Sequence, residues 1–162
     1  MNVNTSTNAK ELLKKQHESC SLHADRIKKA LNEIEKITPL SQIKIANMNT
    51  HELAITELLT GRFAKLQDTL GKKIFPLILI AIGEDTQGMS FIDRLNLLEK
   101  LGYIDDAQHW FDYRDARNAA AHEYSDSPAV MVKNLENIIR LAKELLAYWQ
   151  KLGQKIEKII MQ

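Results

Sequence analysis

Apolar residues recur at helical spacing along most of the chain, and no segment shows the alternation typical of a strand. In the first long segment, residues 9–37, Leu13, Cys20 and Ile27 recur every seven positions, which places them on one face of a helix. Pro39 in "ITPLS" cannot continue that helix. The pattern therefore predicts one long helix that ends before this proline.

Three shorter helical segments are expected in the middle of the chain. The first begins near residues 49–50 and runs as an apolar stripe into "GKKIFPLILIAIG", where Pro76 should kink or break it. The next has Ser90 as its N-cap and is closed by Gly102. The third starts at Asp105 and carries the most unusual polar residues of the sequence.

The last helix has the most regular pattern. From Met131 to Ile159, apolar residues alternate by four and three positions, and a helix of about 30 residues extends about 45 Å. These segments predict an all-α, up-and-down antiparallel bundle with long first and last helices. We expect a flexible N-terminal tail at 1–8, the bundle at 9–152, and a helical extension at 153–162 that pairs with another chain or frays.

Composition narrows the class of protein. The 162 residues, 44% of them hydrophobic, suit one domain with a substantial core. The single cysteine excludes an internal disulfide and fits a reducing compartment. The longest apolar run, residues 74–82, is too short to span a bilayer, and the N-terminus lacks the apolar segment of a secretion signal. We therefore expect a cytoplasmic protein without a membrane partner.

The charges are unevenly distributed although the net charge is only +1. Residues 105–126 contain six acidic and two basic residues. A polyanion would be repelled by that segment, so we expect its attraction to come from the two more basic ends of the chain.

The same acidic segment contains the candidate chemistry, in "RDARNAAAHEYSD" at residues 114–126. On a helical wheel the alanines take one flank, where they allow close packing against a neighbour. The polar residues gather on the other flank, and they are Arg114, Arg117, Asn118 and His122.

This combination suits a phosphodiester. An arginine presents a planar fork to phosphate oxygens, and a histidine can take or give a proton near neutral pH. The 2′-hydroxyl of RNA is an internal nucleophile, so the pair can cleave RNA without a metal ion. Asn118 is positioned to orient the histidine or the phosphate, and Arg114 to supply a second positive contact.

The motif "RNAAAHEY" resembles that of the HEPN superfamily, specifically its HepT-like branch. The shared pattern is an arginine and a polar residue, then a histidine and a tyrosine, here Arg117, Asn118, His122 and Tyr124. The preceding run "SFIDRLNLLEKLGYIDD" and the tryptophan after it are also similar to this group. The resemblance covers residues 9–150.

The resemblance implies a metal-independent endoribonuclease toxin that acts as a homodimer and needs no cofactor. The motifs of both protomers would line a shared cleft, with His122 as the acid/base and Arg117 as the phosphate and transition-state clamp. The implied partner is a minimal nucleotidyltransferase antitoxin, which silences the toxin by adding AMP to Tyr124. Cleavage would be a transesterification that yields a 2′,3′-cyclic phosphate.

Other interpretations stay open. A related branch, the nucleotidyltransferase substrate-binding proteins, shares the motif and implies a non-catalytic binding subunit. Alternatively, Arg117 and His122 only cap and cross-link the end of their helix, with the histidine near its C-terminus and the arginine paired with Asp112 or Asp115. The comb "HESCSLH" at 17–23 suits a metal by spacing, but core packing explains its cysteine better. No role is assigned to His51 or His109.

Overall fold

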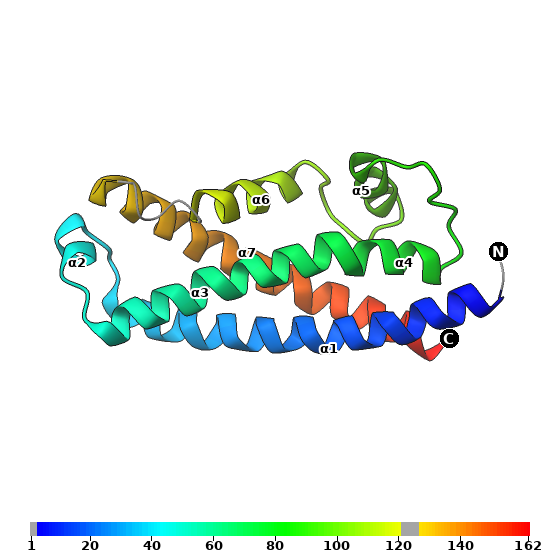
Figure 1. The fold of residues 1–162 in the computed structure, drawn as a ribbon, viewed down its shortest axis with the longest axis horizontal. Helices are drawn as coiled ribbons and strands as arrows, with labels where there is room; N and C mark the ends of the chain where they lie inside the picture. The colour runs from blue at the N-terminus through cyan, green and yellow to red at the C-terminus, as the bar shows by residue number, and fades with distance from the viewer. Residues whose placement is uncertain (1–2, 121–126) are drawn as a thin grey trace.

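The computed structural model describes residues 3–120 and 127–162, and within these ranges the chain is all-α with no strand. Helix α1 packs against α3, α4 and α7, and runs antiparallel to both α3 and α7 (Figure 1). Helices α5 and α6 lie on the side of α3 and α4 that faces away from α1 (Figure 1). The predicted bundle with long first and last helices is confirmed. In chain order the helices are α1 (Val3–Ile34), α2 (Gln42–Ala46), α3 (Thr50–Thr69), α4 (Phe75–Ala81), α5 (Phe91–Lys100), α6 (His109–Ala120) and α7 (Pro128–Met161).

Helix α1 begins earlier than the sequence pattern indicated. Residues 3–8, which we expected in a separate N-terminal tail, are part of α1. The Ser6 hydroxyl donates a hydrogen bond of 2.9 Å to the carbonyl oxygen of Ala81 at the end of α4, and Ala9 is buried one turn later. A tertiary contact with α4 therefore holds this first turn, which no local pattern could reveal.

Pro76 neither breaks nor sharply interrupts the second long segment. Between α3 and α4 the chain forms a π-helix, Leu70–Ile74, and Pro76 lies in the first turn of α4. A proline lacks an N–H donor and crowds the carbonyl four residues before it, and a wider π-turn removes both conflicts. The helix thus continues, and its buried residues include Ile74, Phe75 and Ile78.

Local capping signals fix two of the middle helices as predicted. Asn49 caps α3 in a capping box with Glu52, and Ser90 caps α5 in the same way. Gly102 follows α5 with a φ of +75°, which favours glycine. The five-residue α2 was not predicted.

Helix α6 begins at His109 rather than at the predicted Asp105. The preceding loop is held by side chains instead: the Glu99 carboxylate accepts a 2.7 Å bond from the Ala107 amide, and Asp106 accepts one of 2.7 Å from the Gln108 amide. These bonds satisfy backbone donors that a longer helix would have used.

Helix α7 contributes more to the core than the sequence suggested. The helix continues through residues 153–161, and Ile156 and Ile159 in this part are buried. Gly153 allows this packing, since a Cβ there would lie 3.3 Å from Nε2 of His17 on α1. In the described part of the chain, no helix is both long and apolar enough to cross a membrane.

Candidate functional site

One pocket is lined by both Arg114 and Arg117, and we call it the arginine pocket. Helix α6 presents Trp110, Arg114 and Arg117 to it at helical intervals of four and three residues, which lie on one face. The end of α3, the π-helix and α5 supply the other walls. The cavity measures about 250 Å³, and its lining residues are Gln67, Asp68, Gly71, Lys72, Phe91, Trp110, Arg114 and Arg117.

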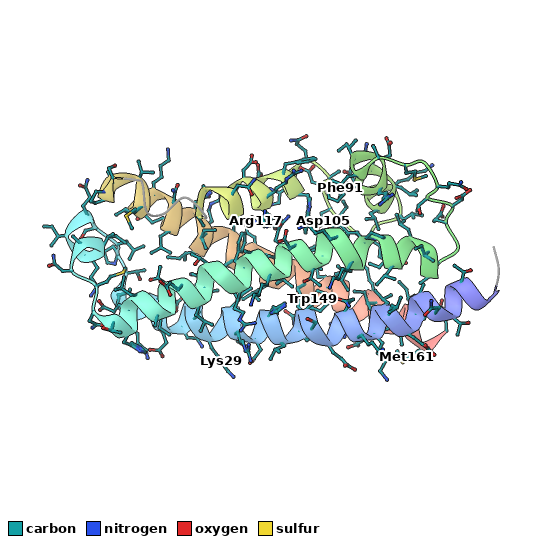
Figure 2. All side chains as sticks on the ribbon, viewed as in Figure 1. Lys29, Phe91, Asp105, Arg117, Trp149 and Met161 are labelled. Atoms are coloured by element: carbon teal, nitrogen blue, oxygen red, sulfur yellow. The ribbon has the colours of Figure 1, made fainter. Side chains whose placement is uncertain are left out.

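Arg117 is held from α3 rather than from its own helix. Its Nη2 donates a 2.7 Å bond to Oδ2 of Asp68, and its Nη1 donates one of 3.1 Å to Oδ1 of Asn118. Figure 2 places Arg117 between α6 and α3. The alternative pairing with Asp112 or Asp115 is therefore wrong.

The Asp68 carboxylate also contacts a second cation of the arginine pocket. Its Oδ1 lies 3.3 Å from Nζ of Lys72, one turn further along the chain. With Arg114, the lining then has three cations against one carboxylate. The motif face of α6 is thus locally positive, although residues 105–126 are acidic as a segment.

Two aromatic side chains approach the π-helix because Gly71 has no side chain. A Cβ on Gly71 would lie 3.3 Å from Cζ2 of Trp110 and 3.7 Å from Cζ of Phe91. Trp110 is buried and packs edge-on against Phe75 with ring centroids 4.7 Å apart, whereas Phe91 is 37% exposed. One wall of the arginine pocket is therefore aromatic and fixed by the core, with an accessible ring beside it.

Gln67 is the one polar or charged residue in the buried class within the described part of the chain. It is 5% exposed, it lines the arginine pocket, and its Oε1 has no hydrogen-bond partner among the described residues. A buried polar atom without a partner costs about 1–3 kcal/mol. Gln67 is not among the site residues predicted from the motif, although the sequence contains a signal for it: a glutamine occupies a core position of the apolar stripe between Phe63 and Leu70.

The structure brings together part of the predicted site. Arg114 and Arg117 line the same cavity, and Asn118 contacts Arg117. Of the alanine flank, Ala116 is buried, and Ala119 and Ala120 are half-buried. His122 and Tyr124 lie outside the described residues.

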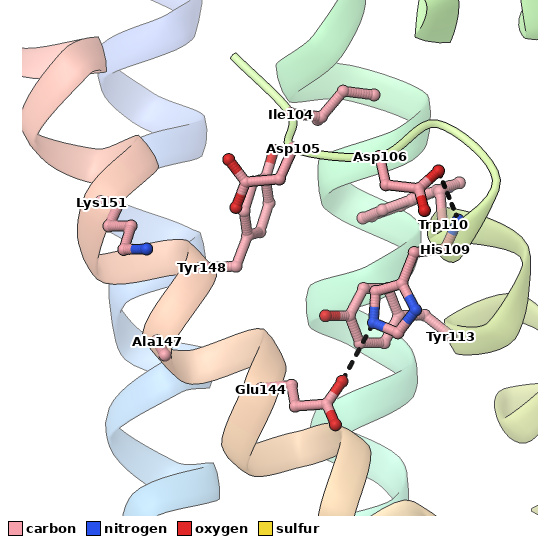
Figure 3. Close-up of a pocket in the computed structure, with 10 residues that line it drawn as sticks. All are labelled: Ile104, Asp105, Asp106, His109, Trp110, Tyr113, Glu144, Ala147, Tyr148 and Lys151. Atoms are coloured by element: carbon pink, nitrogen blue, oxygen red, sulfur yellow. Dashed lines mark hydrogen bonds and ion pairs between the residues drawn. The ribbon is translucent and has the colours of Figure 1, made fainter. Parts of the chain in front are cut away.

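A second pocket of about 290 Å³ lies on the α7 side of α6 (Figure 3). There Nδ1 of His109 lies 2.8 Å from a carboxylate oxygen of Asp112, and its Nε2 lies 3.0 Å from one of Glu144 on α7. Burial, and then the charges of Glu144 and Asp112, raise the pKa of Tyr113 to about 12. His109, which received no role from sequence, thus connects α6 to α7 and helps to orient the motif helix.

Within the comb at 17–23, Cys20 belongs to the core, and the two histidines are half-buried. Cys20 is fully buried, and burial raises the pKa of its thiol to about 12. The ring of His17 packs on Trp149 at 5.1 Å, and Nδ1 of His23 lies 3.2 Å from Nη1 of Arg62. The core-packing interpretation of Cys20 is confirmed. Across residues 3–120 and 127–162, no group of three or more His, Cys, Asp or Glu side chains could hold a metal ion.

Comparison of the chain with models of known families, with curated proteins and with solved structures finds no significant match. Function is therefore inferred from the motif and the arginine pocket. That pocket combines three cations with an aromatic wall, and in other proteins arginines bind phosphate groups and aromatic rings stack on bases.

Proposed function

We propose that the protein is a metal-independent endoribonuclease, the toxin of a HEPN/minimal-nucleotidyltransferase pair. The observation that supports this most is the arginine pocket, where Arg114, Arg117 and Lys72 lie beside Phe91 and Trp110. Guanidinium groups bind phosphate oxygens in a fixed geometry, and aromatic side chains stack on unpaired bases. Each nucleotide of single-stranded RNA offers both a phosphate group and an unpaired base.

The proposed chemistry is an internal transesterification. His122, assigned from the motif, takes the proton of the 2′-hydroxyl, and the 2′-oxygen attacks the adjacent phosphorus. The bond from phosphorus to the 5′-oxygen breaks, and that oxygen receives a proton. The products are a 2′,3′-cyclic phosphate and a 5′-hydroxyl end. Arg117 stabilises the extra negative charge on the phosphorane, and its bond to Asp68 fixes the guanidinium beforehand.

A two-fold homodimer would place two copies of the motif across one cleft, so that one His122 removes the proton and the other supplies it. The antitoxin would be a minimal nucleotidyltransferase. It would transfer AMP from ATP to the Tyr124 oxygen and release pyrophosphate. The added adenylate blocks the cleft by its bulk and negative charge.

The different-class alternative is a non-catalytic subunit that presents a substrate to a nucleotidyltransferase. The ion pair at Arg117 favours it, because a guanidinium already paired with Asp68 at 2.7 Å is partly neutralised. The arginine pocket would then bind a ligand without acting on it.

Growth after induced expression separates these functions. Wild-type protein alone should arrest growth and leave RNA fragments with cyclic phosphate ends, whereas Arg117→Ala and His122→Ala should not. Arg140→Ala is the matched control, because Arg140 is exposed on α7 and pairs with Glu144 and Asn137. Equal growth of all four strains at matched protein levels would rule out the toxin and favour the binding subunit.

A further inference from the structure

We infer that a groove beside the arginine pocket binds the phosphate backbone of the RNA strand that continues from that pocket. The inference rests on the proposed ribonuclease function, since it gives the RNA substrate a second contact surface. We call this surface the lysine groove. It measures about 240 Å³ and lies where α1 packs against α3 and the π-helix. Its lining residues are His23, Lys65, Asp68, Thr69, Lys72 and Lys73.

The lysine groove adjoins the arginine pocket. Asp68 and Lys72 line both cavities, because α3 and the π-helix lie between α1 and α6 (Figure 1). Arg62, Lys65 and Lys72 follow one another at three and seven residues, which places them on one face of the helix. From Arg62 to Lys73 this row of cations extends about 16 Å along the helix axis. A strand that leaves the arginine pocket therefore meets cations over more than one nucleotide.

The cations of the lysine groove outnumber its carboxylates. Of its described lining residues, Asp68 alone is acidic, and this carboxylate already contacts Arg117 at 2.7 Å and Lys72 at 3.3 Å. Lys65 and Lys73 are exposed, and neither forms a salt bridge with a carboxylate of the described residues. Both ammonium groups are thus available to a ligand.

The surroundings of His23 show the same excess of positive charge. Nη1 of Arg62 lies 3.2 Å from Nδ1 of His23. Burial, and then the charges of Arg62, Lys65 and Arg26, lower the pKa of the histidine. Like charges that lie close together repel one another, and a bound polyanion removes this cost.

Single-stranded RNA is the polyanion that fits both cavities together. Proteins bind single strands by combining a basic groove along the backbone with aromatic rings that stack on bases. The lysine groove supplies the first, and Phe91, 37% exposed at the arginine pocket, supplies the second. An acidic peptide would use the cations but would gain nothing from the ring. Because a lysine binds phosphate as a point charge, the groove should add affinity without base preference.

Fluorescence anisotropy of the full chain with labelled 2′-O-methyl RNA tests the lysine groove, because this RNA lacks the nucleophile and reports binding alone. A dinucleotide, which fills only the arginine pocket, is compared with a longer oligonucleotide that reaches both cavities. We expect the wild type to bind the longer RNA at least about tenfold more tightly. Lys65→Gln/Lys73→Gln should remove most of this gain and leave dinucleotide binding unchanged. The slope of log affinity against log salt concentration should fall by about 0.7 per lost phosphate contact, hence by about 1.4.

The matched control is Lys28→Gln/Lys158→Gln, which removes the same charge at exposed positions of α1 and α7 outside both cavities. It should keep the gain. Equal losses in the two double variants, a gain retained in Lys65→Gln/Lys73→Gln, or no binding of RNA by the wild type would each overturn the inference. Polyglutamate that binds the wild type as tightly as the longer RNA would also overturn it and assign the groove to an acidic protein.

Cleavage assays with unmodified RNA distinguish this inference from the proposed function. If the wild type cleaves RNA and Lys65→Gln/Lys73→Gln cleaves the longer RNA with unchanged KM, the lysine groove is wrong and the ribonuclease stands. If no RNA is cleaved but the longer RNA binds in a manner that depends on Lys65 and Lys73, the ribonuclease is wrong and the groove is the RNA contact of a binding protein.

Discussion

Replacement of Gln67 by methionine should make the protein more stable. Methionine fills a similar length and has a similar helix propensity, so the main change is the removal of a buried amide whose Oε1 has no partner in the described residues. Removing such a group should raise the free energy of unfolding by about 1–3 kcal/mol. For a protein of this size, 1 kcal/mol shifts Tm by about 2–4 °C, which gives an increase of about 2–12 °C.

Urea denaturation followed by circular dichroism measures the free energy, and a thermal melt gives Tm. The same change at Gln154, which is exposed on α7, should alter the stability by less than about 0.5 kcal/mol. A Gln67→Met variant less stable than wild type would refute the reasoning, because the amide would then have a partner within the protein.

Three further predictions concern the motif and one titrating side chain. Arg117→Lys should keep a cation beside Asp68 and change Tm little, yet slow RNA cleavage at least about tenfold through loss of the planar fork; an unchanged single-turnover rate would contradict this. Burial, and then the charge of Arg62, lower the pKa of His23. The unfolded chain therefore binds that proton more readily, and stability falls as the pH drops below about 6.5. The urea midpoint should fall less between about pH 7.5 and about pH 5 in His23→Asn than in the wild type, and an equal fall in both proteins would argue against this role of His23. Tyr124→Phe should block AMP addition and spare cleavage, and mass spectrometry that still finds the adenylate would identify another acceptor.

Local sequence signals correctly predicted the helix ends that depend only on residues nearby in the chain. The capping boxes at Asn49 and Ser90 and the glycine at Gly102 are of this kind. The first turn of α1 and the start of α6 depend on contacts with distant segments, through Ser6 and Glu99. A one-dimensional pattern contains no such information, so both starts were misplaced.

The residues of the candidate site also differ in whether local sequence could predict that they lie together. Helical geometry alone placed Arg114 and Arg117 on one flank of their helix, and the structure shows that both line one cavity. Asp68 and Gln67 come from another helix, more than forty residues earlier in the sequence. Their proximity to the motif follows from how α3 packs against α6, which the order of residues does not specify.

The central claim is tested most directly by incubating purified protein with a labelled RNA oligonucleotide in excess EDTA. We predict cleavage that leaves a 2′,3′-cyclic phosphate, that disappears in Arg117→Ala and His122→Ala, and that persists in Arg140→Ala. A 2′-deoxy substitution at the cleaved nucleotide should block it, because the internal nucleophile is gone. Intact RNA with the wild-type protein, or equal cleavage by Arg117→Ala, would contradict the proposed ribonuclease.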